Sequence, residues 1–148
     1  MPIPAFTADG FLPEGIHDCT LEELRDRFGQ FQRTDRRPRL FERFEAFVRE
    51  AKKTGFVVAI IVDGSFVTAR DAPNDVDVII VLTAEHDLGA DLPPFAYNVV
   101  SKPQVRRLHR LDTLVARAGD QDLADHIEFF GRLKDTRDRR RGMLRIRL

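Results

Sequence analysis

Two runs of apolar residues near the middle of the chain predict two neighbouring β-strands. The first run covers residues 56–62 and the second covers residues 75–82, and β-branched residues dominate both. Such side chains are enriched in strands because they pack well on a pleated, half-buried surface. The loop over residues 66–74 is too short to hold a crossover helix, so we expect the two strands to be antiparallel.

Apolar residues at steps of three and four predict helices before these strands. Thr20 and Glu23 have the spacing of a capping box, which predicts a short helix that stops at Gly29. A longer helix begins at Thr34 or Asp35 and ends before the first strand. Its apolar face is predicted to consist of Leu40, Phe41, Phe44, Phe47, Val48 and Ala51.

The second half of the chain predicts a helix, a strand, another helix and a last strand. Ser101, with a proline two positions later, marks the start of the first of these helices. Residues 111–116 fit either the continuation of that helix or a third strand, and we favour the strand because Thr, Leu and Val cluster there. A further helix begins at Asp120 or Asp122, and the alternating residues 142–148 predict an edge strand.

The remaining segments carry weaker patterns. Residues 1–18 contain three prolines and two glycines, which predicts an extended arm. Residues 95–100 are ambiguous, and the basic residues 134–141 predict an exposed loop. The order of strands and helices predicts an α+β (α/β-like) fold, a small mixed β-sheet flanked by helices.

We expect one domain over residues 1–148. Within it, residues 1–19 form the N-terminal arm, residues 36–118 the core, and residues 119–148 a C-terminal helix and edge strand.

Composition is that of a soluble globular protein. The 148 residues are 43% hydrophobic and 32% charged, which allows one buried core, and twelve Phe without Trp predict that the core is rich in Phe. A net charge of zero gives no overall field that favours nucleic acid or a membrane. The single cysteine, Cys19, excludes an intrachain disulfide. No apolar run reaches the ~20 residues of a membrane helix, and no signal peptide is recognisable, so we expect a cytoplasmic protein.

Two aspartates at the start of the second apolar run are the most informative feature. Asp75 and Asp77 are two residues apart, and on a strand this spacing places both carboxylates on one face. Neighbouring like charges repel, but a divalent cation would be bound by both. Mg²⁺ is such a cation, because it prefers oxygen ligands and substrate phosphates. A solvated strand end is the alternative explanation.

The pattern Gly64-Ser65, nine residues, then Asp75-Val76-Asp77-Val78 resembles the signature of the nucleotidyltransferase superfamily typified by DNA polymerase beta. Asp63 departs from that signature, because an apolar residue is usual at its position. The chain also resembles a family of small uncharacterised proteins related to this superfamily. That likeness is carried by DGFLPEGIHDCTLEELRDRFG over residues 9–29, by the central motif, and by the C-terminal GMLRIRL.

The resemblance implies an Mg²⁺-dependent nucleotidyltransferase, which moves a nucleotidyl group from a nucleoside triphosphate to an unknown hydroxyl acceptor. Asp75 and Asp77 would be catalytic metal ligands, together with a third carboxylate from a neighbouring strand. Asp112 is our choice for the third carboxylate, and Glu128 is the alternative although its surroundings look helical. Asp63 is explained by turn geometry, or by a role as an extra ligand.

The glycine and serine of the motif would form the triphosphate cradle. Gly64 allows close approach of the backbone, and Ser65 can donate a hydrogen bond to a phosphate. Arg70, in the loop between the two halves of the motif, is a candidate phosphate contact. The arginines at 106, 107 and 110 could also meet phosphates, but a solvated helix face explains them more simply.

A second hypothesis is a catalytically inactive nucleotidyltransferase-like binding protein, for example one component of a toxin–antitoxin pair. The resemblance implies it, because small stand-alone members of the superfamily occur in such systems. It would act through a protein partner or as a homodimer, in which the C-terminal strand could pair with its copy. Nucleic acid remains a conceivable acceptor that no feature specifically indicates, and a plain α/β domain with a fortuitous aspartate pair is the third hypothesis.

Overall fold

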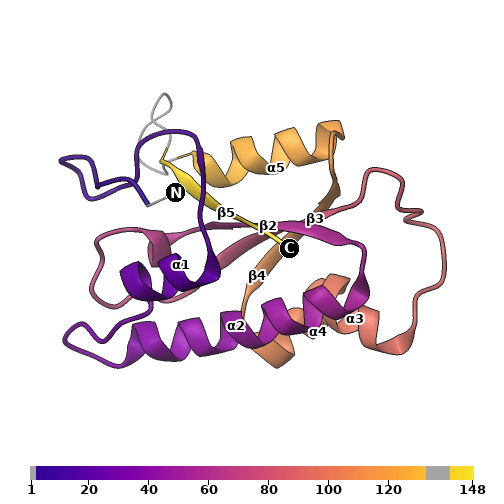
Figure 1. Cartoon of the computed structure of the whole chain (residues 1–148), viewed down its shortest axis with the longest axis horizontal. Helices are drawn as coiled ribbons and strands as arrows, with labels where there is room; N and C mark the ends of the chain where they lie inside the picture. Colours follow the sequence, from indigo (N-terminus) through magenta and orange to yellow (C-terminus); the bar gives the residue numbers. More distant parts are fainter. Residues whose placement is uncertain (1–2, 133–140) are drawn as a thin grey trace.

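A mixed β-sheet between two layers of helices forms the protein in the computed structural model, which describes residues 3–132 and 141–148 (Figure 1). Within these residues the sheet has five strands, in the order β1-β5-β2-β3-β4. The strands are β1 (Ile16–Asp18), β2 (Val57–Asp63), β3 (Asp77–Leu82), β4 (Asp112–Arg117) and β5 (Met143–Arg147). The helices are α1 (Leu21–Phe28), α2 (Arg36–Thr54), α3 (Pro94–Val100), α4 (Lys102–His109) and α5 (Gln121–Gly131), with the 3₁₀ turn η1 (Ser65–Val67). The predicted α+β fold is confirmed.

Helices cover both faces of the sheet. In Figure 1, α1, α2, α3 and α4 lie on one side and α5 lies on the other. Each side has its own apolar core: Phe44 and Val78 belong to the larger one, and Ile61 and Ile79 to the smaller one beneath α5. Because both faces of β2 and β3 are covered, these strands are continuous apolar runs without alternation. The prediction of a Phe-rich core is confirmed by the buried Phe28, Phe41, Phe44, Phe47 and Phe66.

Local signals in the sequence predicted most of the elements correctly. The capping box of α1 is present: Thr20 accepts a hydrogen bond from the backbone N–H of Glu23, and the Glu23 carboxylate accepts one from Thr20. β2 and β3 are antiparallel, and residues 112–117 form a strand, both as predicted. The ambiguous residues 95–100 belong to α3.

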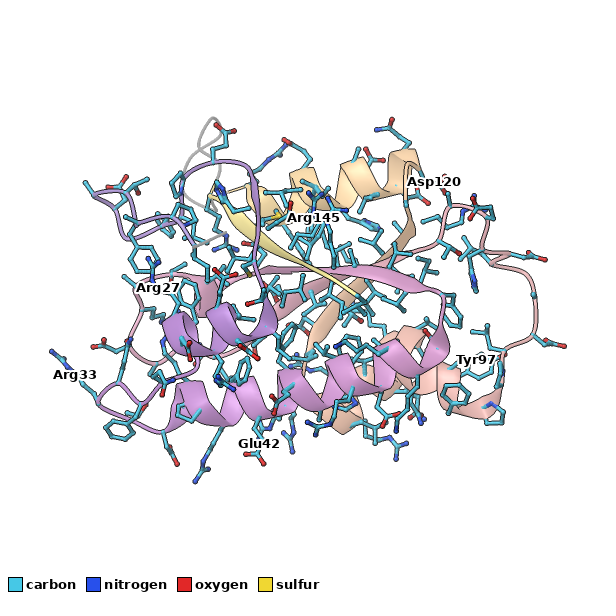
Figure 2. The ribbon with its side chains drawn as sticks, viewed as in Figure 1. Arg27, Arg33, Glu42, Tyr97, Asp120 and Arg145 are labelled. Carbon is cyan, nitrogen blue, oxygen red and sulfur yellow. The ribbon has the colours of Figure 1, made fainter. Side chains whose placement is uncertain are left out.

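The position of the C-terminal strand in the sheet differs from the prediction. β5 is not an edge strand, because it pairs antiparallel with β2 and parallel with β1. Arg145, labelled in Figure 2, links β5 to β1 through Asp18. Its Nε lies 2.6 Å from Oδ1 of Asp18, and its Nη2 lies 3.0 Å from Oδ2. β1 spans three residues of the predicted arm, which is too short a segment for an alternating pattern to reveal.

Arg37, in the first turn of α2, ties the segment after β2 to the helix layer. Its side chain is 1% exposed. The guanidinium donates hydrogen bonds to the backbone carbonyls of Phe28, Phe66, Thr68 and Arg70. Burial lowers the pKa of Arg37, although the nearby Asp71 opposes this effect. The conformation of residues 66–70 therefore depends on one buried side chain from another element.

Two further sequence predictions concern membrane-spanning helices and the basic segment before the last strand. None of the helices in the described part of the chain is long and apolar enough to cross a membrane. The predicted exposed loop over residues 134–141 lies outside the described residues, except for Arg141. That residue is only partly exposed, which contradicts the expectation at this position.

Candidate functional site

Three aspartates are aligned at one end of the strands, where β2 ends and where β3 and β4 begin. The pairing of β2 with β3 places Asp63 opposite Asp77. The pairing of β3 with β4 places Asp77 opposite Asp112. Paired residues on neighbouring strands lie side by side and point to the same face of the sheet. Asp63, Asp77 and Asp112 therefore form an aspartate row, with Asp77 in the middle.

Asp75 does not join the aspartate row. β3 begins at Asp77, so Asp75 precedes the strand, and the prediction that both residues belong to it is wrong for Asp75. Its side chain lines a pocket with Arg43 and Asn74, next to the end of α4. The sequence pattern predicts a strand that starts two residues before β3 does.

Asp77 lies against the backbone of Gly64. Gly64 has φ 88° and ψ −173°, a conformation that is essentially restricted to glycine. A Cβ atom at this position would lie 2.7 Å from Oδ2 of Asp77. The absence of a side chain at Gly64 therefore makes room for the central carboxylate of the row, a contact that the sequence motif did not reveal.

Ser65 and Arg70 share a pocket beside the row. Ser65 begins η1, and with Arg70 and Arg141 it lines a pocket of about 340 Å³, the serine pocket. The backbone carbonyl of Ser65 accepts a hydrogen bond from Oγ1 of Thr68, at 2.7 Å. Ser65 and Arg70, two of the three residues predicted to cradle a triphosphate, thus line the same pocket, and Arg141 adds a second guanidinium that the sequence did not indicate.

Asp63 is fully buried at the end of β2 and contacts Arg141, just before β5. Nε of Arg141 lies 3.0 Å from Oδ1, and Nη2 lies 3.5 Å from Oδ2. The Nε–Oδ1 contact is an ion pair in distance but not a hydrogen bond in direction, since neither atom has a hydrogen-bond partner among the described residues. Burial raises the pKa of Asp63 to about 6, which exceeds the lowering by Arg141 and the backbone N–H of Gly64. Asp77 raises this pKa further.

Asp112, and not Glu128, is in register with Asp77. The Asp112 side chain is 36% exposed, and its Oδ1 lies 2.5 Å from Nη1 of Arg106 on α4. Glu128 lies on α5, where its Oε1 accepts a hydrogen bond from Nη2 of Arg132 at 3.1 Å. The strand predicted for residues 111–116 is what brings Asp112 into the row.

A family model described as Family of unknown function (DUF6932) matches residues 4–147. The chain belongs to this family. No curated protein and no solved structure matches the chain.

The donor set of this DUF6932 protein fits Mg²⁺ in chemistry, but two of its three carboxylates pair with arginines. Carboxylate oxygens are the ligands that Mg²⁺ prefers. Among the described residues, however, no group of three or more His, Cys, Asp or Glu side chains is arranged to hold a metal ion. Asp63 contacts Arg141 and Asp112 contacts Arg106. A cation at the row would require these arginines to turn away.

The buried Asp63 predicts a specific pH dependence of stability in this DUF6932 protein. Its folded-state pKa is about 6, above the value of about 3.9 that an unfolded chain has. Between these values the folded protein holds a proton that the unfolded chain has lost, so the free energy of unfolding falls as pH rises. The expected slope from this group is at most about 1.4 kcal/mol per pH unit.

Urea denaturation of the wild type and Asp63→Asn, measured from about pH 4 to pH 7, checks this prediction. Asparagine keeps the shape of the side chain but does not titrate. The difference in free energy of unfolding between the two proteins should change below about pH 6 and level off above it. Parallel pH curves for the two proteins would contradict the prediction.

Proposed function

We propose that this DUF6932 protein is an Mg²⁺-dependent nucleotidyltransferase, which transfers a nucleotidyl group from a nucleoside triphosphate to a hydroxyl acceptor. The observation that carries the proposal is the aspartate row. Aspartates on three adjacent strands are in register beside a glycine whose conformation leaves space for the central carboxylate. Packing does not require this arrangement, because aligned like charges repel each other.

The carboxylates of the row and of Asp75 have distinct proposed roles. Asp77 and Asp112 are the metal ligands, and Asp75, which precedes β3 and lines a pocket with Arg43, is a further proposed ligand. Asp63 is an additional carboxylate that is available once Arg141 moves. When bound, Mg²⁺ would neutralise charge on the triphosphate and stabilise the leaving pyrophosphate.

The serine pocket supplies the contacts to phosphate in this proposal. The hydroxyl of Ser65 can donate a hydrogen bond to a phosphate oxygen. Arg70 and Arg141, which line the same pocket, can bind phosphate through two parallel N–H groups each. Gly64, which precedes Ser65, leaves room for the Asp77 carboxylate and so allows it to lie close to this pocket.

A second function is favoured by the contacts between arginines and aspartates. In a catalytically inactive binding protein, such as a toxin–antitoxin component, Arg141 and Arg106 would permanently take the place of the metal. Each guanidinium compensates the charge of its aspartate without any cation. Such a protein would bind its ligand or protein partner equally well in the presence of a chelator.

Titration calorimetry with each nucleoside triphosphate, with Mg²⁺ and with EDTA, separates the two functions. We expect the wild type to bind one or more triphosphates in an Mg²⁺-dependent manner, and Asp77→Asn to weaken this binding by about 100-fold. Asp91→Asn, which changes an exposed loop aspartate, is the matched control and should bind like the wild type. Transfer to candidate acceptors is then measured through the pyrophosphate that it releases.

Two results would count against the enzyme. Triphosphate binding that is unaffected by both EDTA and Asp77→Asn would support the inactive binding protein. Absence of triphosphate binding under all conditions would contradict the proposed nucleotidyltransferase and its cradle together.

A further inference from the structure

A second pocket on the other side of the aspartate row is lined mainly by arginines. It measures about 390 Å³, and its lining residues come from α2, from the segment before β3, and from α4 and its C-terminal cap. α2 and α4 lie on the same side of the sheet (Figure 1). We call it the arginine pocket; it is lined by Arg43, Asn74, Asp75, Arg106, Arg107 and Arg110. Four of the six lining residues are thus arginines, and one is an aspartate.

The arginines of this pocket are only partly compensated by neighbouring groups. Arg106 contacts Asp112, as described above. Arg107 donates two hydrogen bonds, at 3.0 and 2.7 Å, to the uncharged amide of Gln104. Arg43 and Arg110 make no ion pair with any described residue. The pocket therefore has an excess of positive charge that a bound anion would balance.

Helix electrostatics alone does not explain this cluster. Basic residues near the C-terminus of α4 interact favourably with the helix dipole, which accounts for Arg106 and Arg107. Arg43, however, lies in the middle of α2. Arg110 caps α4 in a left-handed conformation, φ 59° and ψ 35°, that glycine or asparagine would adopt at lower cost.

We propose that the arginine pocket binds the phosphate group of a small phosphorylated ligand. Arginine suits this role, because its planar fork binds phosphate oxygens through two parallel hydrogen bonds. The volume lies within the range of small-molecule sites. Asn74 adds a neutral donor: its Oδ1 accepts a hydrogen bond from Nη1 of Arg36, which leaves the Nδ2 hydrogens for a ligand. The site needs neither a metal nor nucleotidyl transfer, so it goes beyond the proposed function.

Arg106 connects this pocket to the aspartate row. The same side chain lines the pocket and contacts Asp112. An anion in the pocket competes with Asp112 for the guanidinium, so anion binding frees the Asp112 carboxylate. Coupling of this kind is reciprocal. Removing the charge of Asp112 therefore strengthens anion binding.

Titration calorimetry with inorganic pyrophosphate, in metal-free buffer at low salt, tests the site. We expect the wild type to bind pyrophosphate and the double variant Arg107→Gln/Arg110→Gln to bind it about 10- to 100-fold more weakly, since hydrogen bonds to charged groups are lost. Arg49→Gln removes an exposed arginine elsewhere on α2, which pairs with Glu45, and should leave the affinity unchanged. Thermal unfolding of each variant verifies that it is folded.

Two further variants test the location of the site and the coupling. Arg70→Gln reports any pyrophosphate that binds in the serine pocket instead, and Asp112→Asn should increase the affinity of the arginine pocket by about fivefold. Lack of binding to the wild type, or equal losses in Arg49→Gln and the double variant, would overturn the proposal. A loss of pyrophosphate affinity confined to Arg70→Gln would show that the anion binds in the serine pocket, and this result would also overturn the proposal. Because no Mg²⁺ or nucleotide is present, none of these results bears on nucleotidyl transfer.

Discussion

Replacing Arg37 with methionine is expected to lower the free energy of unfolding by about 3–5 kcal/mol. Four backbone carbonyls, those of Phe28, Phe66, Thr68 and Arg70, accept hydrogen bonds from this guanidinium. Methionine fills similar space but donates nothing, so these buried or part-buried carbonyls lose their partner. Urea denaturation of both proteins measures the difference.

Two matched variants define the origin of this effect. Arg37→Lys keeps the charge but cannot reach four carbonyls with one ammonium group, so most of the loss should remain. Arg39→Gln, two residues along α2, removes an exposed arginine that pairs with Asp35 at 2.7 Å and should cost at most about 0.5 kcal/mol. If Arg37→Met were as stable as Arg39→Gln, the carbonyls would not depend on Arg37.

The same substitution should also affect the candidate site locally. Arg37 holds the segment that follows Ser65 and contains Arg70, so its loss should accelerate amide hydrogen exchange over residues 66–70. Exchange within α5, on the other face of the sheet, should be accelerated only as far as global stability falls.

Gly64→Ala is expected to have the second large effect, because it combines backbone strain with a collision. The backbone at Gly64 has φ 88° and ψ −173°, which costs a residue with a side chain about 1–3 kcal/mol. The new Cβ would lie 2.7 Å from Oδ2 of Asp77, so the carboxylate must shift. We expect the free energy of unfolding to fall by about 3 kcal/mol. If the proposed function is correct, Mg²⁺-dependent binding of the triphosphate should fall with it.

Gly55→Ala is the control for backbone strain. Gly55 ends α2 with φ 75°, and a Cβ there would meet no atom within 4 Å. Its substitution should cost about 1 kcal/mol and leave triphosphate binding unchanged. Equal losses of stability in the two alanine variants, in urea denaturation, would show that the contact with Asp77 contributes nothing.

The sequence predicted those parts of the fold that depend on near neighbours in the chain. The capping box of α1 involves residues three apart, and the apolar face of α2 repeats at three and four residues. The antiparallel arrangement of β2 and β3 followed from the shortness of the loop between them. These features arise from local hydrogen bonding and periodicity, which any stretch of sequence displays directly.

The position of β5 and the content of the site depended on distant parts of the chain. β5 is internal because β1, 3 residues long, pairs with its outer side. Arg141 reaches Asp63 across 78 positions of sequence only because β5 pairs with β2. No residue near Arg141 carries information about that pairing, so the sequence predicted an exposed loop residue.

By itself, the sequence determined most of the helices and strands of this protein, though not β1 or α3, together with its mixed sheet and the motif from Gly64 to Asp77. Only the tertiary structure decided which carboxylates are aligned. Strand register placed Asp63 and Asp112 beside Asp77, and the start of β3 left Asp75 outside the strand. The physical reason is that register results from packing and pairing between whole strands, whereas a motif records only the spacing within one stretch of chain.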